Sequence, residues 1–106
     1  MAKQIVAGID IGGTNTKYGL VDEDGKILLR GSVPTKKYEK ADEFVKALSE
    51  IIITEAKKIP VPLDGIGIGS PNGNYYTGNI EFAPNLLWKG IVPLAKLFTE
   101  AAGVPV

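Results

Sequence analysis

The sequence predicts an α/β domain that begins with an antiparallel three-strand meander and continues with strand–helix–strand units. Three observations support this fold class. Apolar runs near the N-terminus are joined by turns too short for anything but antiparallel neighbours. A long segment with helical period then separates these runs from another short apolar run. A second helical segment leads to a final apolar stretch at the end of the 106-residue chain.

The meander occupies the start of the chain. Gln4–Asp10 is a nearly continuous apolar run, which predicts a strand buried on both faces. A glycine pair turns the chain, and Thr16–Asp22 is the second predicted strand. A short acidic turn leads to the third, Lys26–Val33, which ends at Pro34. We therefore expect three strands that pair in sequence order.

The long helical segment is predicted over Tyr38–Ile59. Its apolar side chains recur every three or four residues, with lysines and glutamates between them, as on the core-facing side of a surface helix. Pro60 stops this helix, and Gly65–Gly69 is then a short, buried fourth strand, followed by a loop at Ser70–Asn74. The predicted apolar stripe of the helix comprises Ala41, Phe44, Val45, Leu48, Ile51, Ile52 and Ile59.

The last third of the chain predicts smaller elements. Tyr75–Phe82 alternates weakly around Thr77–Asn79, which indicates a small hairpin. A second helix is expected to have Pro93 in its first turn and to end at Gly103. Val104–Val106 has the composition of the start of another strand, so we expect one incomplete domain. The side chains that the second helix should bury are Leu94, Leu97, Phe98 and Ala101.

Composition excludes several classes of function. Twelve basic residues balance twelve acidic ones and are interspersed along the chain, so neither nucleic acid nor a membrane surface is an expected partner. Cysteine and histidine are absent, which excludes disulfides, thiolate zinc sites and any histidine-based triad built from these residues. The N-terminus lacks the apolar stretch of a signal peptide, and we expect a cytoplasmic protein.

The segment Gly8–Asp22, GIDIGGTNTKYGLVD, contains the pattern that indicates chemistry. Asp10 ends the first strand, and the bare backbone that follows lets N–H groups converge on an anion. A carboxylate beside such a site is best explained by a divalent cation between it and a phosphate. A plain hairpin, in which the glycines only make the turn, is the alternative. Thr14 and Lys17 favour the functional interpretation, a site for a metal nucleotide.

Two other glycine-rich phosphate motifs are excluded. A P-loop requires a lysine and a hydroxyl residue directly after its last glycine, where this chain has Thr14 and Asn15. The dinucleotide fingerprint requires a different glycine spacing from that of Gly65–Gly69, and it opens a helix rather than a proline-containing loop. The remaining pattern is D-x-G-G-T followed by a strand and a second acid, Asp22.

This pattern resembles the first phosphate motif of the superfamily of sugar kinases, heat-shock ATPases and actin, and more narrowly that of the ROK family (repressors, unknown reading frames and sugar kinases). Gly65–Gly73 is similar to the sugar-side loop of that family, and Phe82–Leu86 with Trp88 is similar to the stretch before its second helix. The three motifs occur in the family's order. The resemblance implies an actin-like ATPase, or ribonuclease-H-like, fold, with residues 1–106 as the N-terminal lobe of a sugar kinase whose C-terminal lobe is absent.

The resemblance also implies ATP and Mg²⁺ as cofactors. Asp10 would act on the metal indirectly, near the transferred phosphate, and Lys17 would supply positive charge. Glycine N–H groups and the side chains after them would hold phosphate oxygens. The implied phosphate-binding residues are Asp10, Gly12, Gly13, Thr14, Asn15 and Lys17.

On the sugar side, the resemblance implies that Asn72, Gly73 and Asn85 face the hydroxyls of a hexose. The first two could equally form a turn that needs positive φ, and Asn85 could cap a turn. Trp88 could provide an apolar platform for a sugar face, but packing is the favoured use.

The implied activity is the ATP-dependent phosphorylation of a hexose, with glucose expected and fructose, mannose or N-acetylmannosamine as alternatives. The family's general base is an aspartate beyond Val106, so no catalytic residue is predicted in this chain, which alone should be inactive. The parent protein is expected to be a homodimer, and the chain alone should self-associate through exposed apolar surface. A sugar-responsive repressor of the same family is an alternative that requires a DNA-binding domain before the first strand. A chaperone-type ATPase lacks the loop at Ser70–Asn74, and a stand-alone binding module would not end on an unfinished strand.

Overall fold

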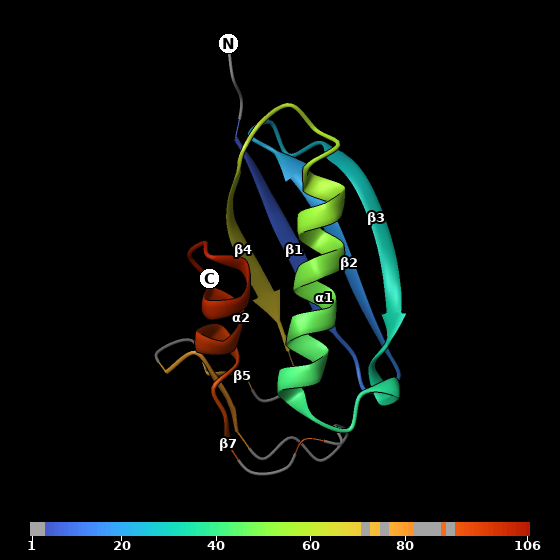
Figure 1. The fold of residues 1–106 in the computed structure, drawn as a ribbon, viewed down its shortest axis with the longest axis vertical. Coiled ribbons are helices and arrows are strands. Elements are labelled where there is room, and N and C mark those ends of the chain that lie inside the picture. Colours follow the sequence, from blue (N-terminus) through green and yellow to red (C-terminus); the bar gives the residue numbers. More distant parts are fainter. Residues whose placement is uncertain (1–3, 71–72, 75–76, 82–87, 89–90) are drawn as a thin grey trace.

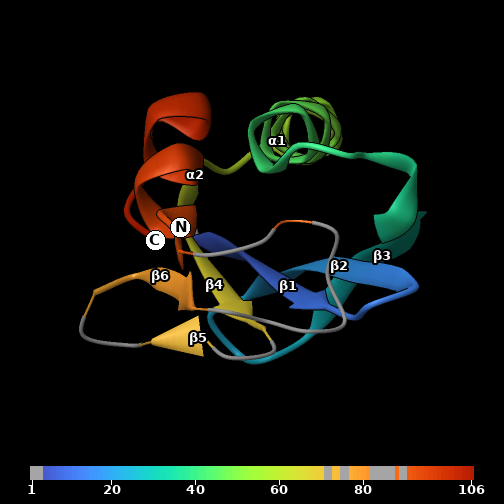
Figure 2. The ribbon, with the colours of Figure 1, turned by 90° about the horizontal axis from the view of Figure 1, so that it is seen from below.

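The structure, a computed structural model, describes residues 4–70, 73–74, 77–81, 88 and 91–106. A four-stranded sheet carries two helices on one face, and a three-stranded sheet lies beside one end of it (Figure 1). Seen from below, both helices lie on the same side of the larger sheet (Figure 2). The α/β class predicted from the sequence is confirmed.

The larger sheet has the strand order β3-β2-β1-β4. β1 is antiparallel to β2 and β2 is antiparallel to β3, so the predicted meander is confirmed. β4 is parallel to β1, as expected for a strand reached through a helical crossover. The strands are β1 Ile5–Ile11, β2 Asn15–Asp22, β3 Ile27–Pro34 and β4 Leu63–Gly69.

β1 is buried on one face only, which contradicts the prediction of burial on both. Every second residue of the strand packs under the helices, while Val6 on the other face is 43% exposed and Gly8 and Asp10 are exposed with it. β4 behaves similarly, because its isoleucines face the helices and Gly67 and Gly69 lie on the open face. The reason is that both helices cover the same face of the sheet. The buried residues of β1 are Ile5, Ala7, Ile9 and Ile11.

The turn between β2 and β3 is organised by Asp22. Its Oδ1 accepts hydrogen bonds from the N–H groups of Asp24, at 2.9 Å, and Lys26, at 3.0 Å. Aspartate commonly organises turns in this way. The second acid of the sequence pattern is therefore a turn residue, at the end of β2 that is distant from Asp10.

The first helix, α1 (Ala41–Ala56), is shorter than the predicted Tyr38–Ile59. A short 3₁₀ turn, η1 (Thr35–Lys37), precedes it, and Tyr38 has extended backbone angles, φ −110° and ψ 113°. The Tyr38 carbonyl accepts a hydrogen bond from Trp88 Nε1 at 3.1 Å, so this residue is bonded outside the helix. At the other end, Ile59 N–H donates to the carbonyl three residues back, and the helix closes in tight turns.

The second helix is α2 (Leu94–Ala102). Gly103 follows it with φ 73° and donates its N–H to the Thr99 carbonyl at 2.9 Å, so the predicted C-terminal glycine is confirmed. Pro93 precedes the helix instead of lying in its first turn. Ala101 is exposed, so its predicted burial was wrong. No helix in the described part of the chain is long and apolar enough to cross a membrane.

The smaller sheet has the order β5-β6-β7 and is antiparallel throughout. An antiparallel pair surrounds Gly78, as expected, but it begins at Gly73 in the segment predicted as loop. The predicted hairpin over Tyr75–Phe82 lies partly outside the described residues, and β7 was not predicted. The strands are β5 Gly73–Asn74, β6 Asn79–Glu81 and β7 Ile91–Val92.

One core lies between the larger sheet and the two helices. Phe44 of α1 and Phe98 of α2 are fully buried. Trp88 is 4% exposed and its ring centroid lies 4.6 Å from that of Phe44, so the expected packing role of this tryptophan is confirmed. Pro105 lies beside the open edge of β4, because its carbonyl accepts the Ile66 N–H at 2.9 Å. The last residues follow the edge of the sheet without forming the predicted strand.

Candidate functional site

Two charged residues of the predicted site lie side by side on the open face of the sheet. Asp10 of β1 and Lys17 of β2 are directly opposite each other in the antiparallel register, and both are exposed. Asp10 is also opposite Gly69 of β4, and its Oδ1 lies 3.9 Å from the position that a Cβ on Gly69 would occupy. Cross-strand neighbours of opposite charge attract each other, so the lysine lowers the repulsion between this carboxylate and an approaching anion.

The tip that joins β1 to β2 consists of residues 12–15. Gly12 N–H donates to the Asn15 carbonyl at 3.0 Å, and a Cβ on Gly12 would lie 2.7 Å from that same oxygen. Gly12 is therefore required by the close approach of the two arms, and its N–H is already bonded. The candidate phosphate donors that remain at the tip are the amides of Gly13, Thr14 and Asn15 with the exposed Thr14 hydroxyl.

The tip is held from the side by a residue that sequence reasoning missed. Thr35 N–H donates to the Thr14 carbonyl at 2.9 Å. The Thr35 hydroxyl lies 2.7 Å from that of Thr16, and both side chains are buried. One signal was available, because Thr16 shares a strand face with Leu20 and therefore places a hydroxyl among apolar residues, where it needs a partner.

A hollow of about 460 Å³ adjoins Asp10 and Lys17 on the open face. Its floor contains glycines from three neighbouring strands, because Gly8 is opposite Gly19 on one side and Gly67 on the other. Arg30 of β3, opposite Gly19, is a further cation on its rim that the sequence analysis did not select. The hollow therefore combines a floor free of side chains with two cations and one carboxylate.

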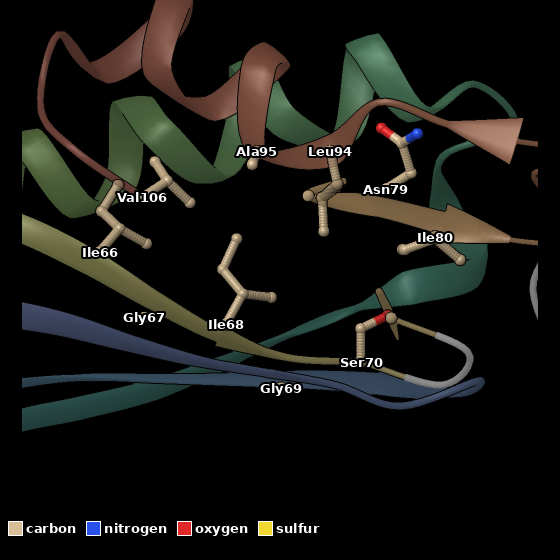
Figure 3. A pocket seen from close by; sticks show the side chains of 12 residues that line it. Ile66, Gly67, Ile68, Gly69, Ser70, Asn79, Ile80, Leu94, Ala95 and Val106 are labelled. Carbon is tan, nitrogen blue, oxygen red and sulfur yellow. The ribbon is translucent and has the colours of Figure 1, made fainter. Parts of the chain in front are cut away.

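A second cavity, of about 540 Å³, lies between β4, β6 and the start of α2. Figure 3 shows the side chains of Ile68 and Leu94 at this cavity, with Val106 above Ile66. Gly73, a predicted sugar-facing residue, is part of its lining, whereas Asn72 and Asn85 lie outside the described residues. Both cavities include Gly67–Gly69 in their linings, so the two predicted half-sites meet at the carboxyl end of β4.

The donor set fits a magnesium ion bound mainly through phosphate. Among the residues that the structure describes, no group of three or more acidic side chains could hold a metal by itself. Mg²⁺ in nucleotide sites commonly takes one or two carboxylates, with phosphates and water as its other ligands. The single exposed carboxylate of Asp10 matches that arrangement, and Asp22 is excluded because it organises the distant turn.

The sheet order, the antiparallel tip and the adjacent carboxylate define a domain of the actin-like ATPase fold, and the comparisons give its family. The ROK family model matches residues 6–106. The chain therefore belongs to the ROK family. A glucokinase from Streptomyces coelicolor is 33% identical over 103 residues, which is 96% of this chain. The chain spans only 31% of the length of that relative.

Solved structures agree with this assignment. A ROK family glucokinase from Streptomyces griseus, in complex with glucose and AMPPNP, matches 96% of this chain and 31% of its own, with a TM-score of 0.79 and 30% identity. A ROK family transcriptional regulator, a homolog of the E. coli MLC protein, matches 97% of this chain and 26% of its own, with a TM-score of 0.74. Its identity is 17%, so this second likeness shows the fold alone.

Proposed function

We propose that residues 1–106 form the N-terminal lobe of an ATP-dependent sugar kinase that converts a hexose, with glucose expected, to its 6-phosphate. Two comparisons support the proposal: the S. coelicolor relative is a glucokinase, and the S. griseus structure contains both glucose and AMPPNP. The observation that carries it is the placement of Asp10 and Lys17 opposite each other beside the glycine tip. We further propose a cytoplasmic, homodimeric parent protein.

In this proposal the chain binds and orients the phosphates of ATP. The amides at the tip and the Thr14 hydroxyl donate to phosphate oxygens, while Lys17 offsets their negative charge. Asp10 orients the metal and its water ligands. Mg²⁺, when bound with the nucleotide, neutralises charge on the phosphates. Phosphoryl transfer depends mainly on such positioning and electrostatics, so residues that never exchange a proton can still control the rate.

The hexose is proposed to lie at the carboxyl end of β4, with Gly73, Asn72 and Asn85 facing its hydroxyls. The support is that the cavity lined by Gly73 shares Gly67–Gly69 with the hollow beside Asp10. The base that takes the proton of the sugar hydroxyl is proposed to lie in the part of the kinase that these residues do not include. The lobe alone then binds without catalysing transfer.

A chimera tests the proposal. The matched 103 residues of the S. coelicolor glucokinase are replaced by this chain, and sugar-dependent ADP production is measured with glucose, fructose, mannose and N-acetylmannosamine. We expect activity that is highest with glucose. Asp10→Asn should lower kcat about 100-fold, as expected for loss of a group that stabilises transition-state charge.

The matched control is Asp64→Asn, an exposed aspartate at the amino end of β4, which should leave kcat unchanged. Circular dichroism establishes that each chimera is folded. A folded chimera without sugar-dependent ADP production would contradict the proposed kinase function. An Asp10→Asn chimera as active as its parent would contradict the role of the carboxylate.

A further inference from the structure

We propose that Thr35 is a positioning residue for the phosphate-binding tip, and this inference rests on the proposed function above. Thr35 is the first residue after β3 and is 3% exposed. It contacts the tip twice, through its N–H to the Thr14 carbonyl at 2.9 Å and through its hydroxyl to that of Thr16 at 2.7 Å. No phosphate-facing role is assigned to its side chain, which is buried beneath the tip.

The backbone bond controls where the tip aims its donors. A trans peptide unit points its carbonyl and the following N–H in opposite directions. Because the Thr14 carbonyl is directed at Thr35 on the β3 side, the Asn15 N–H is directed the other way, toward the β1 arm. The Asn15 carbonyl is fixed separately by Gly12 N–H at 3.0 Å. Thr35 therefore sets the orientation of one of the candidate phosphate donors.

The sequence around Thr35 explains why this bond depends on one residue. Asn15 is opposite Pro34 in the register of β2 and β3, and proline has no N–H to donate. The next N–H along the chain is that of Thr35, which supplies the last bond between β3 and the tip. A loss of the Thr35 geometry would leave the tip attached only through β1 and β2.

The hydroxyl pair then holds Thr35 in place. Thr16 is fully buried, and a buried hydroxyl without a partner is unfavourable, so each threonine satisfies the other. Valine has the shape of threonine without the hydroxyl, so Thr35→Val keeps the packing and leaves Thr16 unpaired. Thr35→Ser keeps the hydroxyl and removes a methyl group. A packing role predicts that serine is the worse substitute, whereas a positioning role predicts that valine is.

The experiment is an amide NMR study of the 106-residue chain with Mg²⁺–tripolyphosphate as the probe. We expect the wild type to show shifts at the tip amides. Thr35→Val should weaken binding about tenfold and speed hydrogen exchange of the Gly12 amide about tenfold, since loss of a buried hydrogen bond corresponds to about that factor. Thr35→Ser should remain within about twofold of the wild type in both measurements. Thr99→Val, which removes an exposed hydroxyl from α2, is the matched control.

The two proposals fail in different ways. A wild-type chain whose tip amides do not respond to the probe contradicts the proposed phosphate site, and the exchange rates still decide the role of Thr35. Unchanged exchange in Thr35→Val, or equal effects of valine and serine, overturns the positioning role. If Thr35→Val does not fold, Thr16→Val breaks the same hydroxyl pair from the other side. It should reproduce the faster Gly12 exchange, and unaltered exchange there would equally overturn the inference.

Discussion

Substituting Gly12 with alanine tests whether close approach of the two arms is what the tip requires. The new Cβ would lie 2.7 Å from the Asn15 carbonyl oxygen, which is far below an ordinary contact. That oxygen belongs to the backbone and also accepts the Gly12 N–H at 3.0 Å. Relief of the clash therefore requires the tip to open, and the bond that closes it is lost.

The expected cost follows from these two contributions. Loss of one backbone hydrogen bond removes about 1 kcal/mol, and residual overpacking adds about 1–3 kcal/mol. We therefore expect the free energy of unfolding to fall by about 2–4 kcal/mol. A small domain has about 5–15 kcal/mol of stability in total, so such a loss is readily measured.

Urea denaturation followed by circular dichroism measures the effect, with Gly8→Ala as the matched control. Gly8 lies in the same strand, and a Cβ there would meet nothing within 4 Å. This control should be neutral or stabilising by about 0.4–1 kcal/mol, because alanine restricts the unfolded chain. Equal stability of the Gly12→Ala and Gly8→Ala variants would refute the argument that the tip is closed by steric necessity.

Three further predictions use the chain alone. Trp88→Phe should lower the free energy of unfolding by about 1–3 kcal/mol, because it leaves the buried Tyr38 carbonyl without its indole donor; an unchanged urea midpoint would contradict this. Light scattering at micromolar concentrations should report masses above 11.3 kDa, since Val6 and Ile27 are 43% and 50% exposed on the open face; a monomer throughout would contradict it. The pure chain should produce no ADP in response to glucose, and measurable glucose-dependent ADP would show that a catalytic base is present.

The strands and their order could be predicted because short turns leave few topologies open. The faces could not, and β1 shows why. Val6 is apolar and Gly8 is neutral to any pattern, so an apolar run from Ile5 onward looks the same whether one face or two are covered. Which face is covered depends on where the helices pack, and both lie on one side (Figure 2). The half-exposed Val6 is the consequence.

The site was predictable in its residues but not in their use. Asp10 and Lys17 were selected from spacing, and the register places them opposite each other. Gly12 was selected as a phosphate donor, yet its N–H is bonded to the Asn15 carbonyl, a contact between residues whose geometry no motif records. Thr35 was not selected, because its importance arises only after β3 has folded beside the tip.

The segment after β3 also connects the tip to the rest of the molecule. Thr35 bonds the tip on one side, and its carbonyl accepts the Tyr38 N–H at 3.3 Å. The Tyr38 carbonyl in turn accepts the indole N–H of Trp88, whose ring packs on Phe44 of α1. One short 3₁₀ turn is thus bonded to the proposed phosphate tip and to a residue of the stretch that resembles the sugar side of the family. Because every bond in this series uses a backbone or buried group, a change at Thr35 or Trp88 alters the position of the other end without touching a ligand.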